Sequence, residues 1–432
     1  MPRAPLGGWL PAIEIVGFNV GMNRVAYVSN KSVYGVSPDS WGDNLRGSWW
    51  YDEDQFRTNQ FAHPYQGNVY FTSARSLGQP FWTSWAYALG GSAMWEWFGE
   101  TEPPSVNDSI TTPFAGGILG EVLFRLSNRV LDGGGDRPGF WHELGALVLS
   151  PANGFNRALY GNRYRPRDLD DQPFTSEFRA GVGVAEQGDV GSTDRTASTP
   201  LSVSIHLVNG VPGSDFAFRR PLDYFDATFA LVVDRKAATS ESYGEIMLRG
   251  LLLGRSYGTA PTRGVWGLYA NYDYIAPPIF RAGSSNLGLG TIGQLDWGAV
   301  ALQGTALIGV GFGSGGSTEV VTGFRDYHIG LQAVTQLDAK LYLWDRLRLR
   351  LVSREYYISG RASPEPDSFE DISYGSLSLT WRVAGPHALG VQLLGARRQA
   401  RYGASPDVAS EYGSLNLFYE LHGTQDLGRG RT

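Results

Sequence analysis

Apolar and polar residues alternate along the second part of the chain but not along the first. From about Phe174 onward the period is two, and the clearest run is HIGLQAVTQLDAKLYL, residues 328–343. Leucine, alanine and isoleucine dominate one set of alternate positions there, while glutamine, aspartate and lysine gather on the other. A helix would scatter these leucines around its circumference, so the pattern predicts a β-strand with one apolar face.

Twelve segments of this kind follow one another. The predicted strands are 174–186, 199–210, 225–235, 243–256, 262–275, 286–296, 299–313, 327–343, 346–360, 372–384, 387–401 and 410–422. Most of them are much longer than the ~5–6 residues typical of strands in globular proteins. They are long enough for tilted strands that cross a bilayer, which need about 9–11 residues.

The connections between these segments support the same interpretation. Those at 296–298, 344–345 and 384–386 are very short, and they alternate with longer polar ones at 314–326, 361–371 and 402–409. Short turns at one end and long loops at the other are typical of outer-membrane barrels, whose short turns face the periplasm. A soluble β-sandwich also alternates, but its inner face would be rich in Val, Ile and Phe. We therefore predict a mainly β fold, an antiparallel transmembrane barrel of about twelve strands preceded by an α-helical domain.

Residues 1–173 form the predicted helical domain, residues 174–423 the barrel and residues 424–432 a C-terminal tail. Helices are expected at 11–29, 81–98, about 112–131, 140–150 and 153–161. Thr112 followed by Pro113 has the pattern of an N-cap and a first helical position. Three glycines at helical spacing should let a neighbouring backbone approach closely. These helix-packing residues are Gly116, Gly117 and Gly120.

Composition removes several classes of function. Three Lys and 33 Arg with a net charge of −6 leave no basic surface for nucleic acid. The absence of Cys excludes disulfides, thiolate catalysis and Cys-ligated metals. The six histidines are scattered without metal-ligand spacing, so no metal and no cofactor is expected.

Targeting signals are equally sparse. No apolar run reaches the ~18–20 residues of a membrane-spanning helix, and no signal-peptide core follows the start of the chain. The outer membrane is the predicted location, and a leader for export is expected to have been removed from this chain.

The segment WEWFGETEPPSVNDSITTPFAGGILGE, residues 95–121, concentrates carboxylates around a Pro-Pro turn. The candidate polar cluster comprises His63, Arg75, Glu96, Glu100, Glu102, Ser105, Asn107 and Asp108. With Ser105 as nucleophile this set would make a lipid hydrolase, but Ser105 is not in a G-x-S-x-G elbow. The spacing of Ser105 and Asp108 is that of a capping box, and Arg75 can neutralise a buried Glu. A structural network is favoured over a catalytic site.

The motifs FAHPYQG, GETEPPSVND and LSPANGFNR, within about residues 10–160, resemble a family of uncharacterised bacterial exported proteins. In that family an N-terminal helical domain of unknown function often precedes a β-rich tail. The resemblance implies a recognised domain but no known activity, so it assigns no functional residues.

Three hypotheses for function remain open. In the first, the helical domain plugs, gates or docks at the periplasmic mouth of the barrel, in solute or lipid passage or in an envelope assembly, with the connection 211–224 as the dock. In the second, the protein is an outer-membrane lipid-modifying hydrolase that uses His63, Glu100 and Asp108. In the third, the barrel anchors a module that binds an envelope protein. The expected partners are outer-membrane lipids or lipopolysaccharide and, through the helical domain, an envelope protein.

Overall fold

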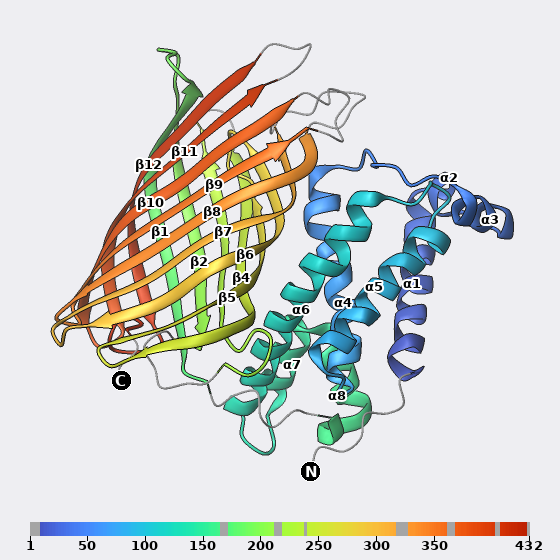
Figure 1. The fold of residues 1–432 in the computed structure, drawn as a ribbon, viewed down its shortest axis with the longest axis horizontal. Helices are drawn as coiled ribbons and strands as arrows, with labels where there is room; N and C mark the ends of the chain where they lie inside the picture. Colours follow the sequence, from blue (N-terminus) through green and yellow to red (C-terminus); the bar gives the residue numbers. More distant parts are fainter. Residues whose placement is uncertain are drawn as a thin grey trace. The chain divides into compact units, whose positions relative to one another are not determined.

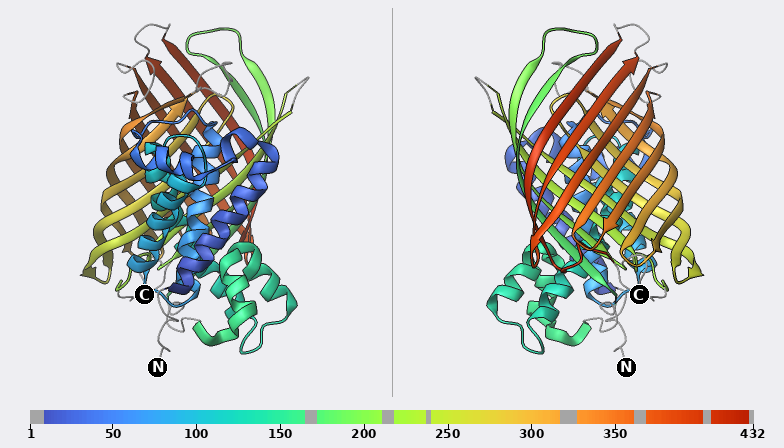
Figure 2. Two further views of the ribbon diagram at one scale, coloured as in Figure 1. Left: turned by 90° about the vertical axis from the view of Figure 1, so that its right-hand side faces the viewer. Right: turned by 90° about the vertical axis from the view of Figure 1, so that its left-hand side faces the viewer.

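The computed structural model describes residues 9–164, 172–210, 218–236, 240–316, 327–360, 368–401 and 407–429. The chain forms two compact units, residues 1–171 and residues 172–432 (Figures 1 and 2). The first unit is helical and the second is a β-barrel, which are the two kinds of structure that the change of periodicity predicted. The sequence placed the division at residues 173/174.

Twelve antiparallel strands close into a barrel in which β1 pairs with β12, as the sequence predicted. The strands are β1 (Phe174–Asp189), β2 (Thr196–Asn209), β3 (Phe225–Arg235), β4 (Ser240–Thr259), β5 (Thr262–Ile275), β6 (Arg281–Asp296), β7 (Val300–Gly316), β8 (Tyr327–Leu343), β9 (Leu347–Ser359), β10 (Phe369–Ala384), β11 (His387–Arg401) and β12 (Val408–His422). Because the ring is closed, no strand edge is left unpaired.

Strand β6 begins five residues before its predicted start at 286. Its first residues, Arg281–Ser285, are small or polar and carry no apolar alternation, yet they pair in register with Phe312–Gly316 of β7. Backbone hydrogen bonds to a neighbouring strand can extend a strand beyond its apolar face. The apolar pattern therefore predicts the core of each strand better than its ends.

The two faces of the barrel differ in polarity. Leu289, Leu331 and Leu417 point outward and are more than half exposed, whereas inward-facing polar residues such as Gln303 and Gln336 are buried. This arrangement is the reverse of that in a soluble protein, and it fits an apolar surround with a polar lumen. The barrel is of the outer-membrane type.

The short connections 260–261, 297–299, 344–346 and 385–386 define the short-turn end of the barrel. Trp344 and Asp345 both have positive φ, 51° and 52°, which matches the backbone twist of a tight hairpin. At the opposite end, the long-loop end, the chain connects six pairs of strands: β1 and β2, β3 and β4, β5 and β6, β7 and β8, β9 and β10, and β11 and β12. Of the connection 211–224 at the short-turn end, residues 211–217 lie outside the described residues.

The helical unit contains α1 (Trp9–Ser29), α2 (Lys31–Tyr34), α3 (Pro38–Arg46), a π-helical turn η1 (Thr58–Ala62), α4 (His63–Ser76), α5 (Phe81–Phe98), α6 (Val106–Gly133), α7 (Phe140–Leu149), α8 (Pro151–Tyr160) and a 3₁₀ turn η2 (Gly161–Tyr164). Among the described helices, none combines the length and the hydropathy that crossing a membrane requires. Helices α1, α5, α7 and α8 lie where the sequence predicted helices.

The predicted start of α6 is wrong. The helix begins at Val106 and not near Thr112, so Pro113 lies inside it and Thr112 is not its N-cap. Ser105 is the N-cap, and its hydroxyl accepts a hydrogen bond from the Asp108 amide at 3.2 Å. The carbonyl of Pro113 accepts a further hydrogen bond from Trp85 Nε1 at 2.9 Å. A proline early in a helix removes a single backbone donor, and packing by α5 holds the helix through this position.

Candidate functional site

A cluster of buried carboxyl groups lies around Asp52, a residue that the sequence analysis did not select. Asp52 accepts hydrogen bonds from Asn59 Nδ2 and Asn107 Nδ2, both at 2.6 Å, and from the Ser105 hydroxyl. Its carboxylate therefore ties the segment before η1 to the start of α6. The sequence signal was weak, because Asp52 stands in an acidic stretch, Asp52–Asp54, that has the pattern of a solvated loop.

Asp52 and Asp108 form a pair of buried carboxyl groups whose pKa values are shifted in opposite directions. Burial alone would raise the pKa of Asp52, but hydrogen bonds from Asp108, Ser105 and Asn59 lower that pKa to about 2. Burial and the adjacent charge of Asp52 raise the pKa of Asp108 well above its usual value. Asp52 is therefore the member of the pair that ionises first, because two like charges this close are unfavourable.

His63 extends this pair into α4. Its Nε2 lies 3.5 Å from Asp108 Oδ2, and its Nδ1 lies 3.2 Å from Gln66 Oε1. Burial lowers the pKa of His63, so the ring is neutral at neutral pH. Gln66 Nε2 then donates to the Tyr70 hydroxyl, which donates to Asn19 of α1. One series of polar contacts thus links α6, α4 and α1, and its part from His63 to Asn19 is hydrogen-bonded.

Glu96, Glu100 and Glu102 surround the Pro-Pro turn and form no ion pair with any described residue. Glu96 Oε2 accepts the backbone N–H of Ser105 at 2.7 Å, and burial raises the pKa of Glu96 to about 8. Burial and the nearby charge of Glu96 raise the pKa of Glu100 well above its usual value. Burial likewise raises the pKa of the more accessible Glu102. Glu96 is therefore stabilised by the backbone N–H of Ser105 and, at neutral pH, by keeping its own proton.

Arg75 lies apart from this cluster. Its Nε donates to Glu121 Oε2 at 2.7 Å, and Arg125 Nε donates to Glu121 Oε1 at 2.8 Å. All three side chains are buried. Arg75 thus neutralises a buried glutamate, but one on α6 rather than one of the candidate acids.

The three predicted packing glycines all lie where α6 meets other elements. A Cβ on Gly116 would lie 2.6 Å from Gly67 Cα, one on Gly117 would lie 2.6 Å from the Trp85 ring, and one on Gly120 would lie 2.8 Å from the Phe71 ring. The absence of a side chain at these positions lets α4 and α5 approach α6 closely.

The geometry of the cluster serves structure better than nucleophilic catalysis. The Ser105 hydroxyl donates to Asp52 and accepts from the Asp108 amide, so it is already used as a helix cap. A serine hydrolase requires that hydroxyl to donate to a base such as His63. Ser105, Asn107 and Asp108 are also almost completely buried, which gives a lipid substrate no access.

A second set of polar groups fills the lumen of the barrel. The Arg348 guanidinium, which is fully buried, donates to Glu420 Oε1 at 2.7 Å and to Glu177. Arg179 donates to Glu420 Oε2, also at 2.7 Å. The alternation in the sequence predicted polar residues on one face of each strand. It does not show which of these residues pair across the lumen.

Further ion pairs follow the lumen toward the long-loop end. Arg354 Nη1 donates to Asp273 Oδ1 at 2.6 Å, and the Tyr356 hydroxyl donates to Asp273 Oδ2 at 2.8 Å. Arg398 forms a two-armed pair with Glu370, with both distances 2.8 Å. Buried charges are therefore compensated inside the barrel, as a low-dielectric interior demands.

Glu177, Glu420 and His422 place three potential metal ligands within 4.8 Å of one another. Arg348 contacts both carboxylates, and Arg179 contacts Glu420. These two guanidinium groups already supply the positive charge that a metal ion would bring. The donor set therefore fits an ion-pair network better than a metal centre.

The C-terminal tail occupies the lumen at the short-turn end. Leu427 is fully buried against Ala301, Tyr342 and Ala388. Arg429 donates to Asp296 at 2.7 Å and to Asp345 at 2.9 Å, and thereby connects two of the short turns. The sequence predicted a C-terminal tail at residues 424–432 but not its position, and the structure describes it as far as residue 429.

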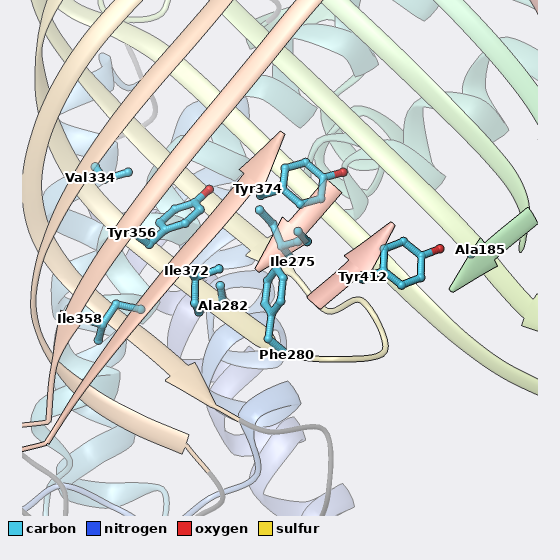
Figure 3. Packing of buried hydrophobic residues seen from close by; sticks show 11 residues of the cluster. Ala185, Ile275, Phe280, Ala282, Val334, Tyr356, Ile358, Ile372, Tyr374 and Tyr412 are labelled. Atoms are coloured by element: carbon cyan, nitrogen blue, oxygen red, sulfur yellow. The ribbon is translucent and has the colours of Figure 1, made fainter. Parts of the chain in front are cut away.

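Near the long-loop end an apolar cluster crosses the lumen (Figure 3). Ile275 and Phe280, which flank the β5–β6 connection, are fully buried and pack in one cluster with Tyr356, Tyr374 and Tyr412. Toward the same end a cavity of about 1490 Å³ is lined by residues that include Ala185, Ser198, Tyr374, Ala396 and Tyr412. The cavity farther inside measures only about 140 Å³. The lumen is therefore wide at the long-loop end and closely packed farther inside the barrel.

Comparison with known families identifies part of the helical unit. Residues 48–152 match the family model described as Domain of unknown function (DUF3943). The match confirms the resemblance to a domain of unknown function, over a shorter stretch than the predicted residues 10–160. Among curated protein sequences, no significant match to the chain is found.

The chain also matches solved structures at low similarity. Pseudomonas aeruginosa OpdQ matches 58% of this chain and 99% of its own, with 10% identity and a TM-score of 0.22. The NanC porin matches 56% and 98%, with 6% identity and a TM-score of 0.28. The TodX monoaromatic hydrocarbon channel matches 65% and 94%, with 10% identity and a TM-score of 0.26.

Proposed function

We propose that the protein is a gated conduit of the outer membrane that is closed in the described state by its own C-terminal tail. The observation that carries this proposal is the tail at the short-turn end, where Leu427 is buried in the lumen and Arg429 joins Asp296 to Asp345. Ion pairs follow the lumen, and such groups can rearrange around a small polar solute.

The ion pairs at the tail are of a kind that can open. Arg429 is buried, but the carboxylates of Asp296 and Asp345 that it contacts lie on turns that are partly accessible to water. The buried Leu427 side chain contributes about 1.5–3 kcal/mol for complete burial. Displacing the tail is therefore within the range that a binding partner can supply.

In this proposal the helical unit is the regulatory module. Its buried hydrogen-bonded network gives it a defined shape, and it directly precedes β1 in the chain. We propose that an envelope protein or a solute-delivering component binds this unit, while lipids or lipopolysaccharide surround the outward leucines of the barrel. The expected export to the outer membrane belongs to the same proposal.

Single-channel recording on the full chain in planar bilayers tests the gate. We expect the wild-type protein to be mostly closed and Arg429→Ala to open more often. Arg401→Ala is the matched control, because Arg401 makes a 3.6 Å exposed pair with Asp407 at the long-loop end. Equal conductance in all three proteins, whether open or closed, would contradict the proposal.

The hydrolase alternative retains one supporting observation, the raised pKa of Asp108 beside the lowered pKa of Asp52. Carboxyl pairs of this kind can act as acid and base. Lipid hydrolysis by the purified protein that Asp108→Asn abolishes without unfolding the helical unit would establish it. Loss of folding in the same variant would instead support a structural network.

A further inference from the structure

The helices on the outside of the helical unit carry their apolar residues outward and their polar residues inward. On α1 every exposed residue from Trp9 to Gly21 is apolar or glycine. The side chains on the opposite face include Asn19 and Asn23, which are buried. A helix at the surface of a water-soluble protein has the reverse arrangement.

The buried amides of α1 are used inside the unit. Asn19 Nδ2 donates to the carbonyl of Gly91 at 3.2 Å, and Asn23 Nδ2 donates to the carbonyl of Gly99 at 2.7 Å. Both contacts hold α1 against α5. Interhelical hydrogen bonds from asparagine are a means by which helices associate when no water is excluded between them.

Helix α5 repeats this pattern. Ser84, Ser92 and Glu96 are buried on its inner side, whereas Trp82 and Leu89 are exposed on its outer side. Its charged residue, Glu96, faces inward, so the exposed face of α5 carries no charge within its described length.

Helix α8 is the third instance. Asn153 and Asn156 are buried, and they donate to Ser127 and Ser76, each at 2.8 Å. The neighbouring Phe155 and Leu159 are more than half exposed. Helices α1, α5 and α8 thus share one arrangement, with polar side chains toward the interior of the unit and apolar side chains toward its outside.

Helix α7 continues the surface, with Phe140, Trp141 and Val148 strongly exposed. Between α7 and α8 lies a groove of about 440 Å³ whose lining includes Leu144 and Leu147. In a soluble protein, an exposed apolar surface of this extent marks an interaction site.

We propose that this outer surface of α1, α5, α7 and α8 is immersed in the acyl chains of a phospholipid leaflet. The exposed residues of α1 run from Trp9 to Val28, and a helix with one apolar face can lie along a leaflet with that face among the acyl chains. The unit belongs to the same chain as a membrane barrel, whose first strand begins at Phe174. A bilayer is therefore the apolar phase in which another part of this chain already lies.

Side-chain chemistry favours lipid over a protein partner. The outward residues are mainly aliphatic side chains and tryptophan, and tryptophan is enriched where protein meets the membrane interface. Protein interfaces add a polar rim and charged residues such as Arg. On α1 the exposed face carries one charged group, Arg24, whose guanidinium lies 5.5 Å from the ring centre of Tyr27.

Site-specific fluorescence tests this proposal, because the natural chain has no cysteine. Val20→Cys on α1 and Leu89→Cys on α5 are labelled with an environment-sensitive dye in the full-length protein. The protein is then reconstituted into phosphatidylcholine vesicles that contain lipids with spin labels on the acyl chains. Leu417→Cys, on the outward face of β12, reports hydrocarbon, and Asp136→Cys, in the exposed loop before α7, reports water.

We expect the spin-labelled lipids to quench the dye at residues 20 and 89 as strongly as at residue 417 and several-fold more strongly than at residue 136. Aqueous iodide should show the opposite order. Quenching of residues 20 and 89 by iodide would overturn the proposal. Protection from both quenchers would overturn it too, because a protein would then cover the surface. Circular dichroism of each labelled protein verifies that the helices are intact.

Discussion

Gly67 of α4 and Gly116 of α6 meet where these two helices cross, and neither position has room for a methyl group. A Cβ on Gly67 would lie 1.8 Å from the carbonyl oxygen of Thr112, and one on Gly116 would lie 2.6 Å from the Gly67 Cα. The two backbones are thus in direct contact. His63 and Asp108 lie on the same pair of helices, so this crossing also sets the distance between them.

Gly67→Ala should destabilise the helical unit by about 1–3 kcal/mol or more, because the added methyl group meets backbone atoms that cannot rotate away. The matched control is Gly90→Ala on α5, where no atom lies within 4 Å of the added carbon. That change should be neutral or stabilising by up to about 1 kcal/mol, since alanine favours helices over glycine. Chemical unfolding followed by tryptophan fluorescence measures both. Equal stability of the two variants would contradict the close crossing.

Glu121→Gln should cost about 3–5 kcal/mol, because it leaves the guanidinium groups of Arg75 and Arg125 buried without their shared counter-charge. Glu143→Gln is the comparison, since Glu143 also pairs with an arginine, Arg157, but is 40% exposed at its side chain. An exposed pair is worth only about 0–1 kcal/mol. The difference in denaturation midpoint between the two variants reports the effect of burial.

The helical unit should lose stability as pH rises through the range in which Glu96 ionises. Burial raises the pKa of Glu96 from 4.5 to about 8, so the folded state holds its proton more tightly than the unfolded chain. Stability from this group is complete below pH 4.5, declines above it, and is lost once the pH has passed about 8. Thermal unfolding of the helical unit between pH 5 and pH 9 measures this decline.

Glu96→Gln should flatten that decline, because an amide stays neutral at every pH and its oxygen can still accept the Ser105 N–H. Its stabilising effect relative to the wild-type protein should appear at pH 9 and not at pH 5. Glu53→Gln, at an exposed position, should leave the pH profile unchanged. A parallel profile for wild type and Glu96→Gln would show that Glu96 is not the group responsible.

Arg348→Ala should loosen the short-turn end of the barrel. Glu177 and Glu420 would lose their shared cation, and the Leu427 carbonyl would lose a donor that lies 3.0 Å away. Breaking a buried pair costs about 3–5 kcal/mol, so the barrel should unfold at a lower temperature on a heat-modifiability gel. Arg346→Ala, in the exposed turn, is the control and should migrate like the wild-type protein.

The barrel could be predicted because its signal is local and repeated. The alternation from His328 to Leu343 is enough to predict which residues face lipid. Closure of the barrel follows because a membrane provides no water to hydrogen-bond the backbone groups of an open strand edge. The ends of the strands were less well predicted. At Arg281–Ser285 pairing with β7 extends the strand where no apolar pattern exists.

The polar cluster shows the opposite case. Its members on the Pro-Pro turn were recognised from sequence because Ser105 and Asp108 have capping spacing. Their common partner, Asp52, is more than fifty residues away and was missed, as the pairing between Asp52 Oδ2 and Asn107 at 2.6 Å has no local signature. The same limit explains the wrong start of α6, because the Thr112-Pro113 pattern outweighed the capping signal of Ser105.

By itself, the sequence of this protein determined the two kinds of structure, the number of strands, the apolar side of each strand and most of the helices. These properties depend on the period at which apolar residues recur, and this period can be read from residues that are close together in the chain. The tertiary structure alone decided that Asp52 and Asp108 share a site, that Arg348 joins Glu177 to Glu420, and that the tail enters the lumen. Those relations depend on distances between residues far apart in the chain, and they are set only when the helices pack and the barrel closes.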